Sequence, residues 1–75
     1  MKNIRSFTAI TEKEGDGYVS LCPEIDVASQ GNTIEEARNH LQEAIELFFE
    51  YASEEEIKSR LKGDFFITNM QIEVG

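Results

Sequence analysis

The segment from Ile34 to Ala52 constrains the fold most, because its apolar residues recur at the three- and four-residue steps of an amphipathic helix. Thr33 and Glu36 form a capping box, which predicts where this helix begins. The apolar side chains span about 200° of the helix circumference, whereas about 100° is enough for a helix that packs on one sheet. A second surface therefore has to contact this helix. The central stripe consists of Ile34, Ala37, Leu41, Ala44, Ile45, Phe48 and Ala52.

Three apolar residues beside this stripe indicate what the second surface is. Leu47 and Tyr51 lie on one side of the stripe and Phe49 lies on the other. Domains as small as 75 residues usually gain stability from disulfides, a metal ion or oligomerisation. Cys22 and His40 are the only cysteine and histidine, so a disulfide is excluded and a structural zinc site is hard to build. We therefore predict no cofactor, and a homodimer or homotetramer with Leu47, Tyr51 and Phe49 in its interface.

The residues before the helix predict three strands. Residues 5–12 are rich in β-branched residues and predict a strand, and residues 18–22 return as a second strand to give a hairpin, whose polar turn contains two glycines. Pro23 ends the second strand, because proline has no N–H to donate to a strand ladder. Residues 25–30 form a short third strand, which Gly31 closes.

The residues after the helix predict a shorter helix and a last strand. Ser53 and Glu56 form a second cap, and Gly63 ends the helix that follows. Residues 68–74 alternate between apolar and polar side chains, as in a strand with one buried face. The order β-β-β-α-α-β predicts one α+β two-layer domain over residues 1–75, with an antiparallel or mixed sheet and helices on one face.

The sequence offers little for catalysis. Cys22 is predicted to be a small core side chain, and His40 a partly buried packing residue at the border of the helix stripe. A two-metal nuclease needs carboxylates that converge from strand centres, and the predicted strand interiors of the hairpin carry none. The glycines of the hairpin turn precede no helix and so form no phosphate loop. We expect a protein that is not an enzyme.

The charge of the chain restricts its partners. Fifteen acidic and seven basic side chains give a net charge of −8, which repels nucleic acid phosphates. Two interpretations stay open: an acidic surface that steers a basic protein toward it, or acidity that only keeps a small domain soluble. With a polar N-terminus, one unpaired cysteine and no apolar run long enough for a membrane span, we expect a cytoplasmic protein without membrane contact.

Three sequence blocks together resemble the HicB-like antitoxin family. They are DGYV at 16–19, CPEIDVASQGNT at 22–33 and EEA at 35–37, and the similarity continues to about residue 50. The motif positions have structural roles: Gly17 turns the hairpin, Pro23 ends a strand and Gly31 turns the chain. The complete set of motif positions is Gly17, Tyr18, Pro23, Gly31, Thr33, Glu36 and Ala37.

The resemblance implies a partial, degenerate RNase H-like fold without nuclease activity. Many similar domains neutralise a small basic RNA-cleaving toxin, HicA, and assemble as dimers or tetramers. Longer members add a C-terminal DNA-binding segment, whereas this sequence stops at Gly75. It also has Asp26-Val27-Ala28 where many members have Pro-Gly-Cys. We therefore expect the short, solitary variety of the family, without DNA binding.

Two functions from different classes follow. The first is an antitoxin of a type II toxin-antitoxin system that captures a HicA-like RNase through acidic side chains at the strand corner and on the helix. The predicted contacts are Glu24, Asp26, Glu35, Glu43, Glu46 and Glu50. For the helix residues the alternative is a merely solvated face. The second function is an orphan oligomeric domain with a structural or regulatory role and no toxin, and the product of the neighbouring gene discriminates between the two.

Overall fold

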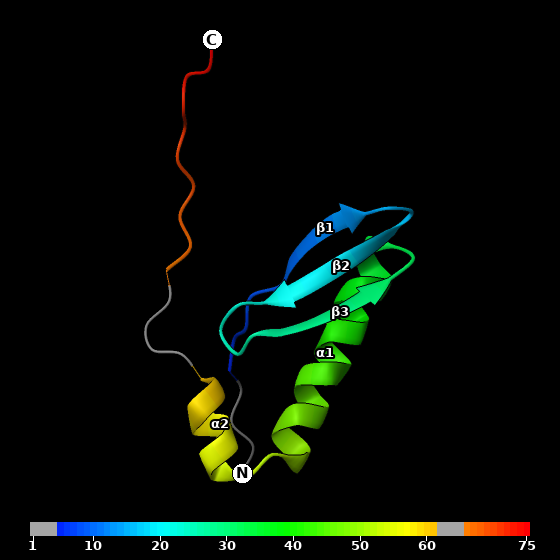
Figure 1. Ribbon diagram of the computed structural model, residues 1–75, viewed down its shortest axis with the longest axis vertical. Coiled ribbons are helices and arrows are strands. Elements are labelled where there is room, and N and C mark those ends of the chain that lie inside the picture. Colours follow the sequence, from blue (N-terminus) through cyan, green and yellow to red (C-terminus); the bar gives the residue numbers. More distant parts are fainter. Residues whose placement is uncertain (1–4, 62–65) are drawn as a thin grey trace.

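The computed structural model describes residues 5–61 and 66–75, and its strands form one antiparallel sheet in the order β1-β2-β3 (Figure 1). The helices follow the strands in the chain, so the predicted α+β class is confirmed. The elements are β1 (Ile10–Glu14), β2 (Gly17–Cys22), β3 (Val27–Gly31), α1 (Ile34–Tyr51) and α2 (Glu54–Arg60).

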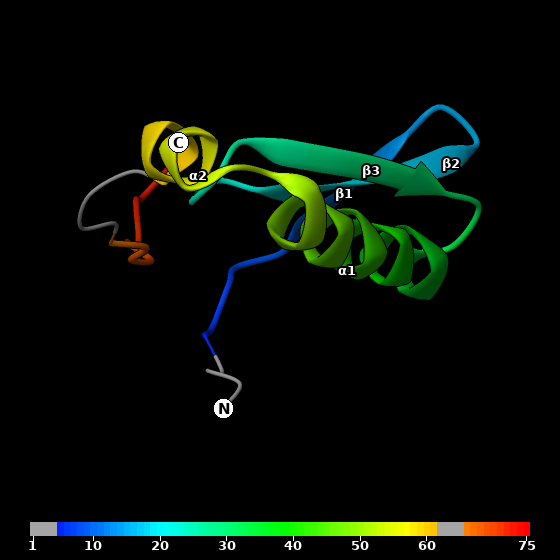
Figure 2. The same cartoon turned by 90° about the horizontal axis from the view of Figure 1, so that it is seen from below.

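Strand β1 begins five residues later than the sequence predicted, and the cause lies in β2. Ile10 pairs with Leu21, so Cys22 is the last residue of β2 with which a residue before Ile10 could pair. The next residue, Pro23, has no N–H to donate to a strand. Residues 5–9 therefore leave the sheet plane on the side of α1 (Figure 2). At the other end of β1, the turn is made by Gly15, which has a φ of +60°.

Two other glycines are needed for close packing and not for turning. A Cβ on Gly31 would lie 2.5 Å from the backbone nitrogen of Ala37, where the first turn of α1 passes over β3. A Cβ on Gly17 would lie 3.0 Å from the Gly31 carbonyl oxygen. Gly17 and Gly31 were predicted to turn the chain. The structure corrects these roles, because a side chain at either position would press against neighbouring backbone.

Helix α1 covers one face of the sheet, and the small core lies between them (Figure 2). Cys22, Ile25 and Leu41 are buried together there, with Ala37 buried at the start of the helix. As predicted, the Thr33 hydroxyl accepts a hydrogen bond from the Glu36 amide at 3.0 Å. The Glu36 carboxylate accepts from the Asn32 amide at 3.2 Å, one residue before the amide that a capping box uses.

Helix α2 lies at the end of the sheet where β2 turns into β3 (Figure 1). The Ser53 hydroxyl caps it by accepting from the Glu56 amide at 3.1 Å, as predicted. At its last residue, the Arg60 guanidinium donates to the carbonyl oxygens of Ile25 and Asp26 at 3.5 and 3.4 Å. Leu61 then packs against the core. The predicted stop at Gly63 lies outside the described residues.

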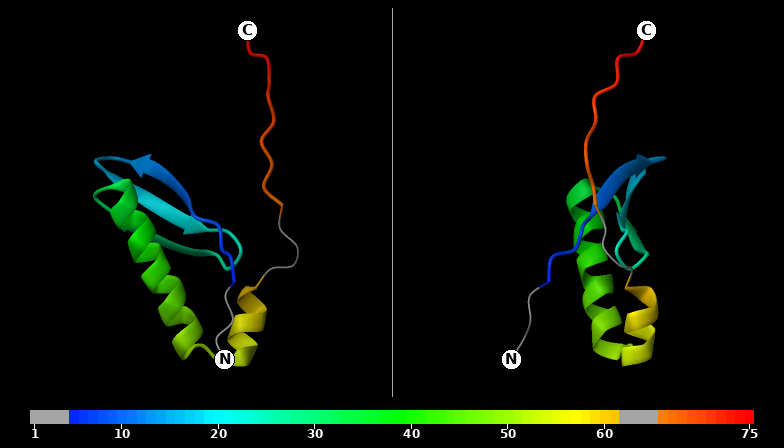
Figure 3. Two further views of the ribbon diagram at one scale, coloured as in Figure 1. Left: turned by 180° about the vertical axis from the view of Figure 1, so that it is seen from behind. Right: turned by 90° about the vertical axis from the view of Figure 1, so that its left-hand side faces the viewer.

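Residues 66–75 form an extended arm in place of the predicted fourth strand, which corrects the β-β-β-α-α-β order. The arm stands apart from the sheet (Figures 1 and 3). A strand requires a hydrogen-bonded neighbour, and the arm has none among the residues that the structure describes. All of its side chains are exposed, including Phe66 and Val74 at 84% each. An alternating sequence pattern indicates a strand with two different faces, but it does not specify a neighbouring strand with which to pair.

Candidate binding surfaces

The Glu24 carboxylate holds the N-terminal segment against the β2–β3 corner. It accepts hydrogen bonds from the Thr8 amide at 3.0 and 3.1 Å, from the Thr8 hydroxyl at 2.6 Å and from the Cys22 thiol at 3.4 Å. Partial burial on its own would raise the pKa of Glu24, but these hydrogen bonds outweigh it and lower the pKa below its ordinary value. This half-buried side chain was predicted to contact a partner, and the structure gives it an internal role.

Cys22 and His40 occupy positions that do not bring them together. Cys22 is completely buried, as predicted, and burial, followed by its hydrogen bond to Glu24, raises the pKa of its thiol. His40 was predicted to be partly buried but is exposed, because residue 40 falls just outside the arc of α1 that faces the sheet. Its Nδ1 lies 2.7 Å from the Gln30 carbonyl oxygen, so the ring ties α1 to β3 at the sheet edge.

The predicted acidic contacts divide into three locations. Asp26 is exposed at the β2–β3 corner, where its φ of 57° places it in the left-handed region. Glu46 and Glu50 border a groove described below, whereas Glu35 and Glu43 are exposed elsewhere on α1. The residues from 35 to 50 span about 22 Å at 1.5 Å per helical residue. The four glutamates form a long stripe along α1, with Asp26 on a separate part of the chain, and not one compact patch.

An open groove of about 910 Å³ lies between residues 5–9 and α1, on the side of the sheet where β1 is the edge strand. Its apolar side chains come from both segments, and its border is polar with both charges. The apolar residues are Phe7, Ala9, Leu41, Ile45 and Phe49. The polar residues are Arg5, Arg38, Gln42, Glu46 and Glu50. Sequence reasoning missed this groove because segments about 40 residues apart form it; the overly wide apolar arc of α1 was the signal for it.

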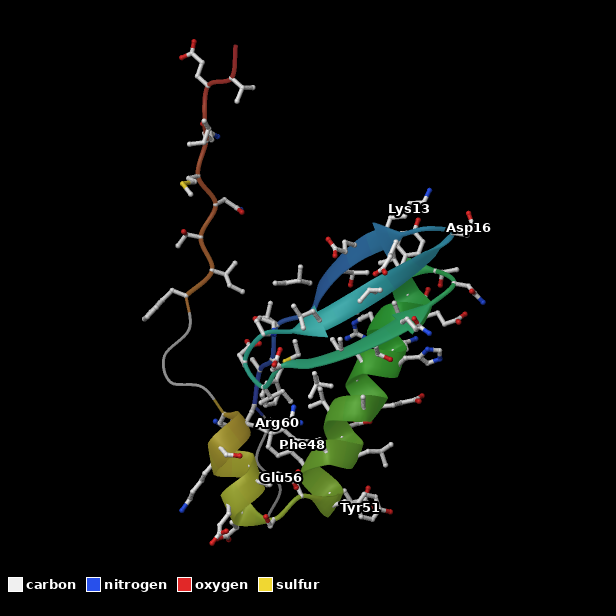
Figure 4. The ribbon with its side chains drawn as sticks, viewed as in Figure 1. Lys13, Asp16, Phe48, Tyr51, Glu56 and Arg60 are labelled. Atoms are coloured by element: carbon white, nitrogen blue, oxygen red, sulfur yellow. The ribbon has the colours of Figure 1, made fainter. Side chains whose placement is uncertain are left out.

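The three residues of the predicted oligomer interface do not share one surface. Phe49 packs inside the chain, with its ring centroid 5.5 Å from that of Phe7 and 5.3 Å from that of Phe48. Leu47 and Tyr51 are 53% and 78% exposed. In Figure 4, Tyr51 points away from the sheet at the end of α1, whereas Arg60 lies against the Phe48 ring at 5.8 Å. Leu47 and Tyr51 are therefore free to meet another molecule.

Within residues 5–61 and 66–75, no group of three or more His, Cys, Asp or Glu side chains could hold a metal ion. None of the helices described is long and apolar enough to cross a membrane.

These features define a small α+β domain in which one capped helix crosses a three-stranded antiparallel sheet and leaves an apolar groove open beside β1. The chain belongs to the UPF0150 family. It is 42% identical over 59 residues to a UPF0150 protein of Thermotoga maritima, a match that covers 73% of this chain and 79% of that protein. It is also 47% identical over 51 residues to a UPF0150 protein of Synechocystis sp., covering 65% of each chain.

No family model matches the sequence, and no solved structure does.

Proposed function

We propose that this chain is a HicB-like antitoxin that acts in the cytoplasm, without catalysis of its own, by binding and neutralising a small basic HicA-like RNA-cleaving toxin. The observation that carries the proposal is the set of three HicB-like sequence blocks over residues 16–37, in a chain with a net charge of −8. Charge of this density attracts a basic partner and repels RNA. The toxin would thus be captured by the protein itself and not through a shared nucleic acid.

The exposed carboxylates of α1 are the proposed contact surface. Glu35 and Glu43 are exposed and lie outside the groove, so both can reach a partner without displacing other parts of the chain. Glu46, Glu50 and Asp26 extend the same acidic character toward the other end of the helix. Glu24 contributes to this surface indirectly, by fixing the corner on which Asp26 lies.

The experiment uses the full chain and the small basic protein encoded beside it. We expect Glu35→Gln with Glu43→Gln to weaken binding about tenfold at low salt, with a smaller effect at high salt where charges are screened. Glu12→Gln with Glu14→Gln is the matched control, because it removes the same charge from exposed positions on β1. Calorimetric titration measures both. The proposal fails if no small basic neighbour binds at low salt, or if both double variants weaken binding equally.

A second candidate is an orphan oligomeric domain with a structural or regulatory role. The exposed side chains of Leu47 and Tyr51 favour this alternative, since they offer an apolar surface that an acidic toxin-binding face does not need. A chain that assembles with itself, but leaves the RNase activity of every basic neighbour unchanged, would support this function and exclude the antitoxin.

A further inference from the structure

We infer that residues 66–75 of one copy pair as a β-strand with β1 of a second copy, and that their apolar side chains fill the groove beside β1. The inference concerns contact between copies of this chain and does not depend on a toxin. It assigns an occupant to the groove and a partner to the arm, which are two uncovered apolar features of the described structure.

The arm has the pattern of a strand with one buried face. Thr68, Met70, Ile72 and Val74 alternate with Asn69, Gln71 and Glu73, so an extended arm presents one largely apolar and one polar side. The large apolar side chains on the apolar side, Phe66, Met70, Ile72 and Val74, are between 70% and 84% exposed in the single chain. Such a continuous apolar strip marks an interaction surface.

Strand β1 is the free edge that suits the arm. The sheet order β1-β2-β3 leaves two edge strands, each with unpaired backbone donors and acceptors. At the β3 edge, however, α1 packs directly beneath the strand, and His40 already occupies the carbonyl of Gln30. On the β1 side, the open groove lies between α1 and residues 5–9, which lead into β1.

The side-chain directions of the two partners agree. Thr11 bonds to the buried Ser20 hydroxyl at 2.9 Å, so odd-numbered residues of β1 face α1 and Glu12 faces outward. A strand added beside β1 would direct alternate side chains toward Ile45 and Phe49 in the groove. Met70 and Ile72 then become buried, while Gln71 stays in water beside Glu12.

A second copy is the occupant because exchange between two copies satisfies both at once. Each chain donates one arm and receives one, so a two-fold dimer closes without leaving an apolar arm or groove unfilled. In the structure the arm runs clear of its own sheet, after an α2 that Arg60 and Leu61 fix at the corner (Figure 3). The buried core of this chain is small, and a dimer of this kind enlarges it.

The first experiment measures the mass of the full chain by light scattering at micromolar concentration. We expect a dimer at twice the chain mass of 8.5 kDa, and a monomer for Met70→Asp with Ile72→Asp. Asn69→Ser with Gln71→Ser changes the polar side without placing a new charge beside Glu12 and should remain dimeric. Because the arm lies outside the sheet and helices, circular dichroism should show unchanged helix content in both variants.

The second experiment distinguishes exchange from an arm that folds back on its own chain. One variant carries Glu12→Cys and another carries Gln71→Cys; they are unfolded, mixed, refolded and treated with a short bismaleimide. Cys22 is completely buried and should not react. A cross-linked heterodimer of the two variants is expected. A third variant carries both cysteines in one chain. The inference is overturned by a monomeric wild type or by a dimer that survives Met70→Asp with Ile72→Asp. It is also overturned if cross-linking occurs only within single chains of the third variant.

Discussion

At the scale of single residues, the Glu24 carboxylate accepts a backbone hydrogen bond that a neighbouring strand would otherwise accept. Strand β2 ends at Cys22 before Pro23, so the Thr8 amide finds no strand partner and donates to the Glu24 carboxylate instead. An ionised acceptor makes a stronger hydrogen bond than a neutral one. The charge of Glu24 therefore contributes to the stability of the corner that carries Asp26.

We expect Glu24→Gln to lower the free energy of unfolding by about 1–2 kcal/mol at pH 7. The folded-state pKa of Glu24 lies below its ordinary value of 4.5, so its ionised form stabilises the fold above that value and the stabilisation is lost as the pH falls through the folded pKa. The difference between wild type and variant should therefore shrink at pH 3. Urea denaturation at both pH values measures it, and exposed Glu43→Gln is the control. Equal differences at the two pH values would contradict this role.

Gly31 is the position where adding one carbon atom should lower the free energy of unfolding most. Its Cβ would lie 2.5 Å from the Ala37 nitrogen, and backbone cannot move aside as a flexible side chain can. We expect Gly31→Ala to destabilise the protein by about 1–3 kcal/mol, because α1 has to shift away from β3. Gly15→Asn, in an open turn at a φ of +60°, should be much milder. Thermal unfolding of both variants tests this, and an unchanged Gly31→Ala melting temperature would refute it.

At the scale of elements, short sequence motifs predicted where the helices begin, but not how the strands pair. The caps at Thr33 and Ser53 require only neighbouring residues, and both hydroxyls accept the predicted hydrogen bonds, although the Glu36 carboxylate binds the Asn32 amide and not that of Thr33. The start of β1 depends instead on Pro23 and Glu24, more than ten residues away in the chain. The groove and the course of residues 66–75 depend on how distant segments meet, and for this reason neither could be predicted.

The α1 cap gives a prediction at this scale. Thr33→Ala removes the hydroxyl that accepts from the Glu36 amide, and we expect a loss of about 1 kcal/mol in the free energy of unfolding. Thr33→Ser keeps the acceptor and should retain most of the stability. Chemical denaturation followed by circular dichroism compares the two. A serine variant as unstable as the alanine variant would show that the hydroxyl does not cap the helix.

At the scale of the whole molecule, the two proposals use different surfaces. In the inferred dimer, the arm of one copy would enter the groove of the other, which Glu46 and Glu50 border. Glu35 and Glu43 lie outside the groove and stay available to a basic partner. A dimer would then present two acidic stripes. Charge-removing changes at 35 and 43 should therefore leave the mass unchanged, and changes at 70 and 72 should alter it.

Neutralisation of the toxin tests the central claim most directly. The small basic RNase encoded beside this protein is incubated with RNA and increasing amounts of the full chain, and intact RNA is measured. The proposed function predicts that cleavage falls in proportion to the added chain and stops when the proteins reach a fixed ratio. Cleavage that continues unchanged with the folded chain in large excess would contradict it.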